Sequence, residues 1–357
     1  MADAKPDLNW EQIREFAGQV SSDVGAAMMG GLSYIGDRLG IFRALAEAGE
    51  VTCAELARRS GLQERYLREW LGAMTAAGYL TYEPSSAKYR MPPEHAMVLA
   101  NEDSPFFLGG FVQMVMPNLS IVPKLKDAFE RGGGVPQSAY PPELWEAMER
   151  SSAAMYKHRL VRKWLPAMPQ VVERLSNGGS ALDVGCGSGR AAIAIAKGFP
   201  KARVSGYDVH PGSVERARAN AKAEGVGDRV TFEVVDGARL PAGEFDLVST
   251  FDVVHDSVDP VGLVRAIRNA IKPDGTYFMV EVNVSPRLED NINPLGRMMY
   301  SVSTLYCMTV SLAHGGAGIG ACMGEPKANE ITKTAGFTQF RRLPIDDVFS
   351  ALYEVRL

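Results

Sequence analysis

The chain has 357 residues, of which 46% are hydrophobic and 22% are charged. These fractions are those of an ordinary globular protein, so wholesale disorder and a collagen-like fibre are excluded, and the length suits two domains. The net charge of −4 argues against a protein that holds nucleic acid by bulk positive charge. The four cysteines contain no C-x-x-C pair, so we expect no disulfide scaffold and no metal site, and a reducing cytoplasm fits this composition.

Nothing in the sequence favours a membrane segment. The first ten residues, MADAKPDLNW, lack the apolar core of a signal peptide. Two long stretches without charged residues, 104–123 and 298–324, are interrupted by glycine, proline, asparagine or histidine, whereas a spanning helix needs about 20 predominantly apolar residues. An apolar ligand pocket in a soluble, cytoplasmic protein explains both stretches better.

Residues 1–100 have the pattern of a winged helix-turn-helix domain. Apolar residues recur at helical spacing over 32–46. Thr52, with Glu55 three residues later, predicts the capped start of a second helix over 54–60. A third helix is expected over 64–77, followed by a two-stranded wing over 79–82 and 88–91.

This domain has two interpretations. The helix over 64–77 would be the one that enters the major groove of DNA, but its two arginines and two glutamates sum to zero. Residues 1–100 contain 10 Lys and Arg against 13 Asp and Glu, a net charge of −3, and a phosphate-binding face needs positive charge. We therefore expect a dimerisation domain rather than a DNA-binding one.

The remaining chain divides into two parts. Residues 101–175 are expected to form a helical connector and active-site lid. Residues 176–357 alternate predicted strands and helices, which is typical of a mostly parallel, doubly wound α/β sheet.

A glycine motif opens this third part. Residues 180–190 read SALDVGCGSGR, an apolar strand that carries Asp183 and is followed by Gly185, Gly187 and Gly189. The dinucleotide fingerprint is instead G-x-G-x-x-G. A carboxylate two residues before the first glycine would repel a pyrophosphate, but it suits a ligand that carries positive charge and no phosphate. S-adenosylmethionine is such a ligand.

Two further acids follow the next two predicted strands. Asp208 ends the strand over 203–207, where a carboxylate can accept hydrogen bonds from a ribose diol. Asp236 ends the strand over 229–235, where it could receive the adenine amino group, and Gly237 gives the backbone room. Each acid alone could be a solvated strand end, but three at successive strand ends favour a shared nucleoside site.

With these motifs the chain resembles class I S-adenosylmethionine-dependent methyltransferases over about its second half. The resemblance implies a Rossmann-like sheet of seven strands in the order 3-2-1-4-5-7-6, with the seventh antiparallel. It implies that Asp183 and the glycines lie near the methionine part, that Asp208 holds the ribose, and that Val209 and Asp236 flank the adenine. It also implies that the backbone near Phe251 faces the cofactor ammonium group.

The residues after the fourth predicted strand help to distinguish which class of molecule accepts the methyl group. Residues 251–256, FDVVHD, lack the Asn/Asp-Pro-Pro-aromatic run of nucleobase and glutamine methyltransferases. His255-Asp256 resembles the His-Asp pair of plant-type small-molecule O-methyltransferases and of a related bacterial winged-helix branch, although Ser257 stands where the plant enzymes commonly have Trp. The resemblance implies that His255 is a general base. Asp256 would either orient the imidazole or cap the next helix, and His255 could instead be a packing residue.

The acceptor pocket is predicted from the connector and from the uncharged C-terminal stretch. The candidates are Tyr140, Tyr156, Met299, Tyr306, Cys307 and His314. Each could equally be ordinary core. We therefore expect a homodimeric enzyme that methylates oxygen or sulfur of a small molecule, without nucleic-acid or membrane partners. The alternatives are a winged-helix transcription regulator with the methyltransferase fold as ligand sensor, and a methyltransferase that acts on RNA or protein.

Overall fold

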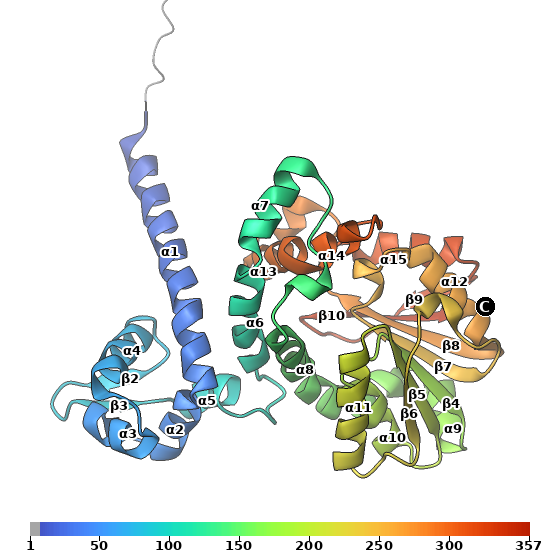
Figure 1. The fold of residues 1–357 in the computed structure, drawn as a ribbon, viewed down its shortest axis with the longest axis horizontal. Coiled ribbons are helices and arrows are strands. Elements are labelled where there is room, and N and C mark those ends of the chain that lie inside the picture. The colour runs from blue at the N-terminus through green and yellow to red at the C-terminus, as the bar shows by residue number, and fades with distance from the viewer. Residues whose placement is uncertain (1–7) are drawn as a thin grey trace, which may run out of the picture. The chain divides into compact units, whose positions relative to one another are not determined.

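The computed structural model describes residues 8–357, which form two units (Figure 1). The first unit ends at Met116 and the second runs from Pro117 to Leu357. Residues 1–7, which include most of the segment examined above for a signal peptide, lie outside the described residues. No helix within 8–357 combines the length and apolarity that a bilayer crossing requires.

The first unit is helical with a small sheet. Its elements are α1 (Trp10–Arg38), α2 (Ile41–Ala48), β1 (Val51–Thr52), α3 (Cys53–Ser60), α4 (Glu64–Ala76), β2 (Thr81–Glu83), β3 (Lys88–Arg90) and α5 (Pro93–Leu99). The predicted capping box is confirmed, because the Glu55 amide donates to Thr52 Oγ1 and the Thr52 amide donates to the Glu55 carboxylate. The winged-helix arrangement is therefore present, with β1 as an additional strand beside β3.

The single helix predicted over 32–46 is wrong. The chain leaves the helix at Leu39 and Gly40, and Gly40 has a left-handed φ of 67°. Glycine adopts this conformation at little cost, so α1 ends there and α2 starts in a new direction. Gly36 has a separate role, since a Cβ at this position would lie 2.5 Å from the Trp70 ring.

The charged side chains of α4 are satisfied within that helix. Arg65 pairs with Glu69 and Arg68 pairs with Glu64, each at 2.5 Å. This arrangement agrees with the balanced charge expected from the sequence. Both arginines are already paired with a glutamate, so neither is an unpaired cation available to bind a DNA phosphate.

Helices α6 (Gly109–Leu119), in which the boundary between the units falls, and α7 (Val122–Arg131) begin the connector. It continues with α8 (Glu143–Met155), a π-helical segment (Tyr156–Trp164) and α9 (Pro169–Ser176). Helices with this wider hydrogen-bonding pattern are rare and occur frequently at functional sites.

The second unit contains a seven-stranded sheet in the order β6-β5-β4-β7-β8-β10-β9. Its strands are β4 (Ser180–Val184), β5 (Arg203–Asp208), β6 (Val230–Val234), β7 (Phe245–Phe251), β8 (Ile271–Val282), β9 (Gln339–Arg342) and β10 (Ser350–Arg356). β10 runs antiparallel to both of its neighbours, β8 and β9, and the other neighbouring strands of this sheet pair in parallel. In chain order this is 3-2-1-4-5-7-6, so the strand order implied by the resemblance is confirmed.

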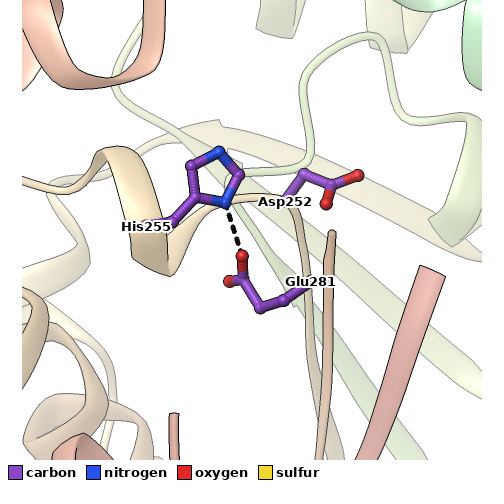
Figure 2. A group of neighbouring side chains, drawn as sticks. All are labelled: Asp252, His255 and Glu281. Atoms are coloured by element: carbon purple, nitrogen blue, oxygen red, sulfur yellow. Dashed lines mark hydrogen bonds and ion pairs between the residues drawn. The ribbon is translucent and has the colours of Figure 1, made fainter. Parts of the chain in front are cut away.

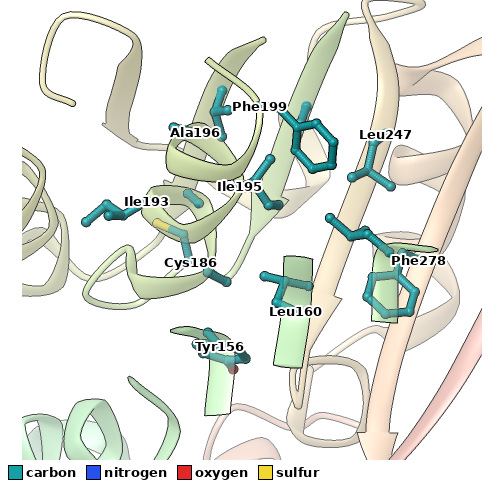
Figure 3. Close-up of a cluster of buried hydrophobic side chains, with 14 of the residues drawn as sticks. Tyr156, Leu160, Cys186, Ile193, Ile195, Ala196, Phe199, Leu247 and Phe278 are labelled. Carbon is teal, nitrogen blue, oxygen red and sulfur yellow. The ribbon is translucent and has the colours of Figure 1, made fainter. Parts of the chain in front are cut away.

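Helices cover both faces of this sheet. They are α10 (Arg190–Gly198), α11 (Pro211–Ala223), α12 (Pro260–Ala270), α13 (Pro294–Val302), α14 (Met308–Ala313) and α15 (Gly324–Thr334), together with α9. Alternate residues of one strand enter different cores, as a pleated strand requires. Ala181 packs with α9, α10 and α11 in the core of Figure 3, whereas Leu182 and Val184 pack with α12 and α15.

One largely covered carboxylate ties the connector to the helices that follow the glycine motif. Glu149 of α8 accepts hydrogen bonds from Arg190 (2.8 Å), Asn220 (2.9 Å) and Arg216 (3.3 Å). The Asn220 side chain also donates to the Ser188 carbonyl inside the glycine motif, at 3.0 Å. These hydrogen bonds fix the position of α8 relative to the glycine motif.

Candidate active site

The glycine turn after β4 requires glycine at each of its three glycine positions. Gly185, Gly187 and Gly189 have φ values of 70°, 53° and 77°, a left-handed region that other residues rarely adopt. A Cβ at Gly189 would lie 2.5 Å from the Phe232 ring, and one at Gly185 would lie 2.6 Å from the Val253 side chain. Around Gly187 no atom lies within 4 Å of such a Cβ, so the middle of the turn is open.

Asp183, which the sequence links to the cofactor, is buried with an unsatisfied oxygen. Its side chain is 1% exposed. Oδ1 accepts a hydrogen bond from Ser249 at 3.3 Å, and Oδ2 has no partner among the described residues. Burial raises the pKa of Asp183 to about 8. A positively charged ligand would favour the ionised form of this carboxyl group.

The other two strand-end acids lie at the same edge of the sheet. Asp208 ends β5, where its two oxygens accept hydrogen bonds from the amides of Gly187 and His210, both at 2.8 Å. Val209, next in the chain, is an apolar side chain left 60% exposed. Asp236 and Gly237 follow β6, and Asp236 is exposed. This edge therefore combines acidic side chains with exposed apolar surface.

The candidate base stands one strand further along. Phe251, the last residue of β7, pairs with Val280 of β8. Asp252 and Glu281, the residues that follow these two in the chain, therefore begin side by side. A short helical turn over Val254–Asp256 then carries His255. Phe251 itself is buried. Since Val253 contacts the glycine turn, the base loop and the turn after β4 lie side by side.

His255 is held by a carboxylate that sequence reasoning missed. Glu281 Oε2 lies 2.5 Å from His255 Nδ1, as Figure 2 shows, and Glu281 Oε1 accepts a hydrogen bond from the Val254 amide at 3.0 Å. Both side chains are 3% exposed. Glu281 therefore fixes the imidazole plane and engages Nδ1, so Nε2 is the nitrogen that Glu281 does not engage.

This contact changes the basicity of His255. Burial disfavours the charged imidazolium, but the Glu281 carboxylate and the Cys307 side chain together outweigh burial and raise the pKa of His255 well above its usual value. The Cys307 thiol is hydrogen-bonded to the same imidazole. Burial raises the pKa of that thiol, so it is a neutral group at ordinary pH. The result is a buried Glu-His pair with a thiol beside it.

Other residues occupy both of the roles predicted for Asp256. Glu281 is the group that orients the imidazole. The cap of α12 is Asp259, whose side chain accepts a hydrogen bond from the Gly262 amide at 2.8 Å. Asp256 ends its turn three residues too early to cap α12, and burial raises its pKa to about 7.

Three of the six pocket candidates, Tyr140, Tyr306 and Cys307, are buried near one another. Tyr140 and Tyr306 meet edge to face at 5.3 Å, and Trp145, which sequence reasoning missed, contacts both Tyr306 and His210. Tyr156 contacts the ring of Phe251 at 5.0 Å. Tyr306 and Cys307 end a second π-helical segment, Ser303–Cys307.

The remaining two candidates differ from each other. Met299 is buried in α13. His314 is exposed at the end of α14. The glycine-rich stretch after it does reach the base loop, because the Ala317 amide donates to the Val258 carbonyl and the Gly320 amide to the His255 carbonyl, both at 3.0 Å.

The group formed by Asp252, His255 and Glu281 has donor atoms that suit a metal ion. One ligand atom from each of Asp252, His255 and Glu281 lies within 4.8 Å of the others. Two of these atoms already bond to each other at 2.5 Å, so a metal ion would have to separate them.

Comparison with known families identifies two parts of the chain. Residues 175–336 match the sequence profile of a family described as "Methyltransferase domain". Residues 26–101 match one described as "Rv2258c-like winged HTH domain".

Two curated relatives match part of the chain. A ubiquinone biosynthesis O-methyltransferase from Neisseria meningitidis serogroup C is 35% identical over 113 residues, which are 31% of this chain and 47% of the relative. Methyltransferase GfsG from Streptomyces halstedii is 32% identical over 125 residues, 34% of this chain and 45% of the relative. The chain thus matches about half the length of these relatives.

Solved structures with the same fold cover nearly the whole chain. Mitomycin 7-O-methyltransferase has a TM-score of 0.71 at 20% identity, covering 97% of this chain and 99% of its own. Human N-acetylserotonin methyltransferase, solved in complex with S-adenosylmethionine, has a TM-score of 0.65 at 19% identity, covering 100% and 99%. The chain therefore joins a winged helix-turn-helix domain to a methyltransferase domain with the fold of these O-methyltransferases.

Proposed function

We propose that the protein is an S-adenosylmethionine-dependent methyltransferase that acts on a small molecule, with oxygen as the favoured acceptor atom. The observation that carries this proposal is the buried Glu281–His255 pair, which stands beside the glycine turn and the acidic strand ends of a methyltransferase domain. Such a pair supplies a base at the edge of the sheet where a parallel α/β fold binds ligands.

The residues at the strand ends suit this cofactor. Asp183 offers an unpartnered carboxylate oxygen toward a cation, and Asp208 retains acceptor capacity toward ribose hydroxyls. Val209 and the residues 236–237 offer exposed apolar surface and a carboxylate for the adenine. The methionine part would lie along the glycine turn and the backbone near Phe251. The bound cofactor supplies an activated methyl group on sulfur.

His255 removes the proton of the acceptor. With Nδ1 engaged by Glu281, the acceptor hydroxyl donates to Nε2, and the proton remains on an imidazolium that the Glu281 carboxylate stabilises. A base whose pKa is raised is better matched to a phenol, with an ordinary pKa of about 10, than to a thiol, which is more acidic by itself. This match favours oxygen over sulfur.

The connector, residues 101–175, serves as the lid over the acceptor. It contributes Tyr140 and Tyr156, and Glu149 anchors it to the helices that follow the glycine motif. Together with Met299, Tyr306 and Cys307 these side chains form the pocket wall for a small, largely apolar acceptor. The exposed His314 has no part in this wall.

The first unit makes the protein a homodimer. Helix α1 exposes Trp10, Phe16 and Met28 by about two thirds each, at 66%, 65% and 69%. These residues share one face of the helix with other exposed apolar residues, namely Ile13, Val20, Val24 and Ile35. An extended apolar face of this kind marks a protein interface, and a second copy of α1 provides the matching surface.

Calorimetry with S-adenosylhomocysteine and S-adenosylmethionine tests cofactor binding. We expect saturable binding of both. The affinity for S-adenosylmethionine should rise by roughly tenfold from pH 6.5 to pH 8, because the Asp183 carboxyl group has a pKa of about 8 and the cofactor cation binds its ionised form. In Asp183→Asn this rise should be absent in the same buffers. Absence of binding to the wild-type protein would refute the proposed cofactor.

Transfer of a labelled methyl group from S-adenosylmethionine tests the reaction. The acceptor source is a cell extract separated by size, and label should enter the small-molecule fraction. His255→Ala should reduce the rate by about 10²–10⁴-fold, since it removes the base. His95→Ala in the first unit is the matched control. Label in the macromolecular fraction alone, or an unchanged rate in His255→Ala, would contradict this mechanism.

Glu281→Gln tests the origin of the raised basicity. We expect the pKa of His255 to fall from well above 6.5 in the wild type to below it in the variant, because burial then acts without the opposing carboxylate. The measurement is an NMR titration of the His255 ring nitrogens. An identical titration of both proteins would show that Glu281 does not set the pKa.

Light scattering after size exclusion tests the dimer. The wild-type mass should be about twice 38.7 kDa, and Phe16→Glu should shift the population toward monomer by placing a charge in the apolar face. Ser22→Glu, on the opposite face of α1, is the control that should remain dimeric. A monomeric wild-type protein at micromolar concentration would exclude this arrangement.

A further inference from the structure

Asp252 is brought to the base by an unusual backbone conformation. It follows β7 with a φ of 56°, in the left-handed region. Asp and Asn enter this region more readily than other side chains apart from glycine. Figure 2 shows Asp252 drawn next to His255 and Glu281. A ligand atom of Asp252 lies within 4.8 Å of one from His255 and one from Glu281.

Asp252 differs from Glu281 in having no partner. Glu281 uses both oxygens, toward Val254 and His255. Within residues 8–357, the structure shows no hydrogen bond or ion pair of the Asp252 carboxylate, and the side chain is exposed. It is therefore an accessible carboxylate next to the reacting groups.

The charges around Asp252 are unbalanced. Apart from His255, the charged groups that act on it are Glu281 and Asp256, which are both acids. When His255 is neutral and acts as a base, no positive side chain compensates these acids. A bound cation would relieve this repulsion.

The cofactor alone does not supply enough positive charge. Its sulfonium and ammonium groups carry two positive charges and its own carboxylate carries one negative charge. Asp183 and Asp252 both raise the pKa of the buried Tyr156 hydroxyl, so both acids lie near it. Asp183 is the one with a buried, unpartnered oxygen beside the glycine turn, and it takes the cofactor charge. Asp252, beside the base, remains uncompensated.

We propose that Asp252 forms a cation-binding subsite next to His255 and selects acceptors that carry a protonated amine close to the hydroxyl group that is methylated. This inference rests on the proposed function, since it takes His255 as the group that contacts the acceptor. The amine would form an ion pair with Asp252 while the hydroxyl donates to His255. A divalent metal ion and the cofactor ammonium are competing occupants that the experiment separates.

Matched phenols test the subsite by calorimetry on protein saturated with S-adenosylhomocysteine. The probes are 2-(aminomethyl)phenol against 2-ethylphenol and the corresponding 3-substituted pair, in which a protonated amine replaces a methyl group of similar size. We expect at least one amine to bind the wild type at least tenfold more tightly than its neutral partner. Asp252→Asn should remove this preference, and Asp228→Asn, at an exposed acid elsewhere, should retain it. Asparagine also tolerates the left-handed backbone at position 252.

Each other outcome has a defined meaning. The subsite is refuted if no amine binds more tightly than its neutral partner, including the case in which none of the phenols binds. It is refuted if the preference survives in Asp252→Asn while S-adenosylhomocysteine affinity falls tenfold, since Asp252 would then hold the cofactor. It is also refuted if chelator removes the preference and Mg²⁺ or Zn²⁺ restores it. Failure of the wild type to bind S-adenosylhomocysteine would instead refute the proposed function itself.

Discussion

The hydrogen bond between Glu281 and His255 is the interaction on which the chemistry of this site depends. It joins the short turn that follows β7 to the neighbouring strand β8, and both side chains are almost inaccessible to water. A histidine buried without a carboxylate would lose its proton readily and become a poor base. The Glu281 carboxylate and the Cys307 side chain together reverse that effect, and the carboxylate fixes the ring without engaging Nε2. The fold supplies the alignment, because β7 and β8 are in register where they end.

Uncompensated negative charge is the second feature of the site. Asp183, Asp208 and Asp252 stand at or just beyond strand ends, and none of them forms an ion pair with a lysine or arginine in the part of the chain described here. Elsewhere in the same unit the largely covered acid Glu149 is paired with Arg190 and Arg216. This contrast indicates that the strand-end acids are available to bind a positively charged ligand. S-adenosylmethionine carries such charge.

Much of the fold and part of the site could be predicted from the sequence. The glycine motif and the acid after each strand are local signals, since a strand end and a left-handed turn need particular residues at fixed spacing. The strand order came from the resemblance to a family, not from periodicity. The break at Gly40 was also visible as a glycine, but the helical spacing of apolar residues on both sides of it concealed the change of direction.

The missed residues share one property, which is that their roles depend on contacts between distant segments. Glu281 is an acid inside an apolar strand, and that pattern alone could have marked it as functional. Its pairing with His255 required the register of β7 and β8. Trp145 meets Tyr306 and His210 only through the packing of the connector. Asp252 was not singled out, because its positive φ cannot be read from the sequence.

A crystal structure of the protein with S-adenosylhomocysteine would test the central claim most directly. We predict that the ligand lies across the carboxyl ends of β4, β5 and β6, with its ribose at Asp208 and its sulfur facing the side of His255 that Glu281 leaves free. A ligand bound elsewhere, or a sulfur atom shielded from His255 by the protein, would contradict the account of how this site transfers a methyl group.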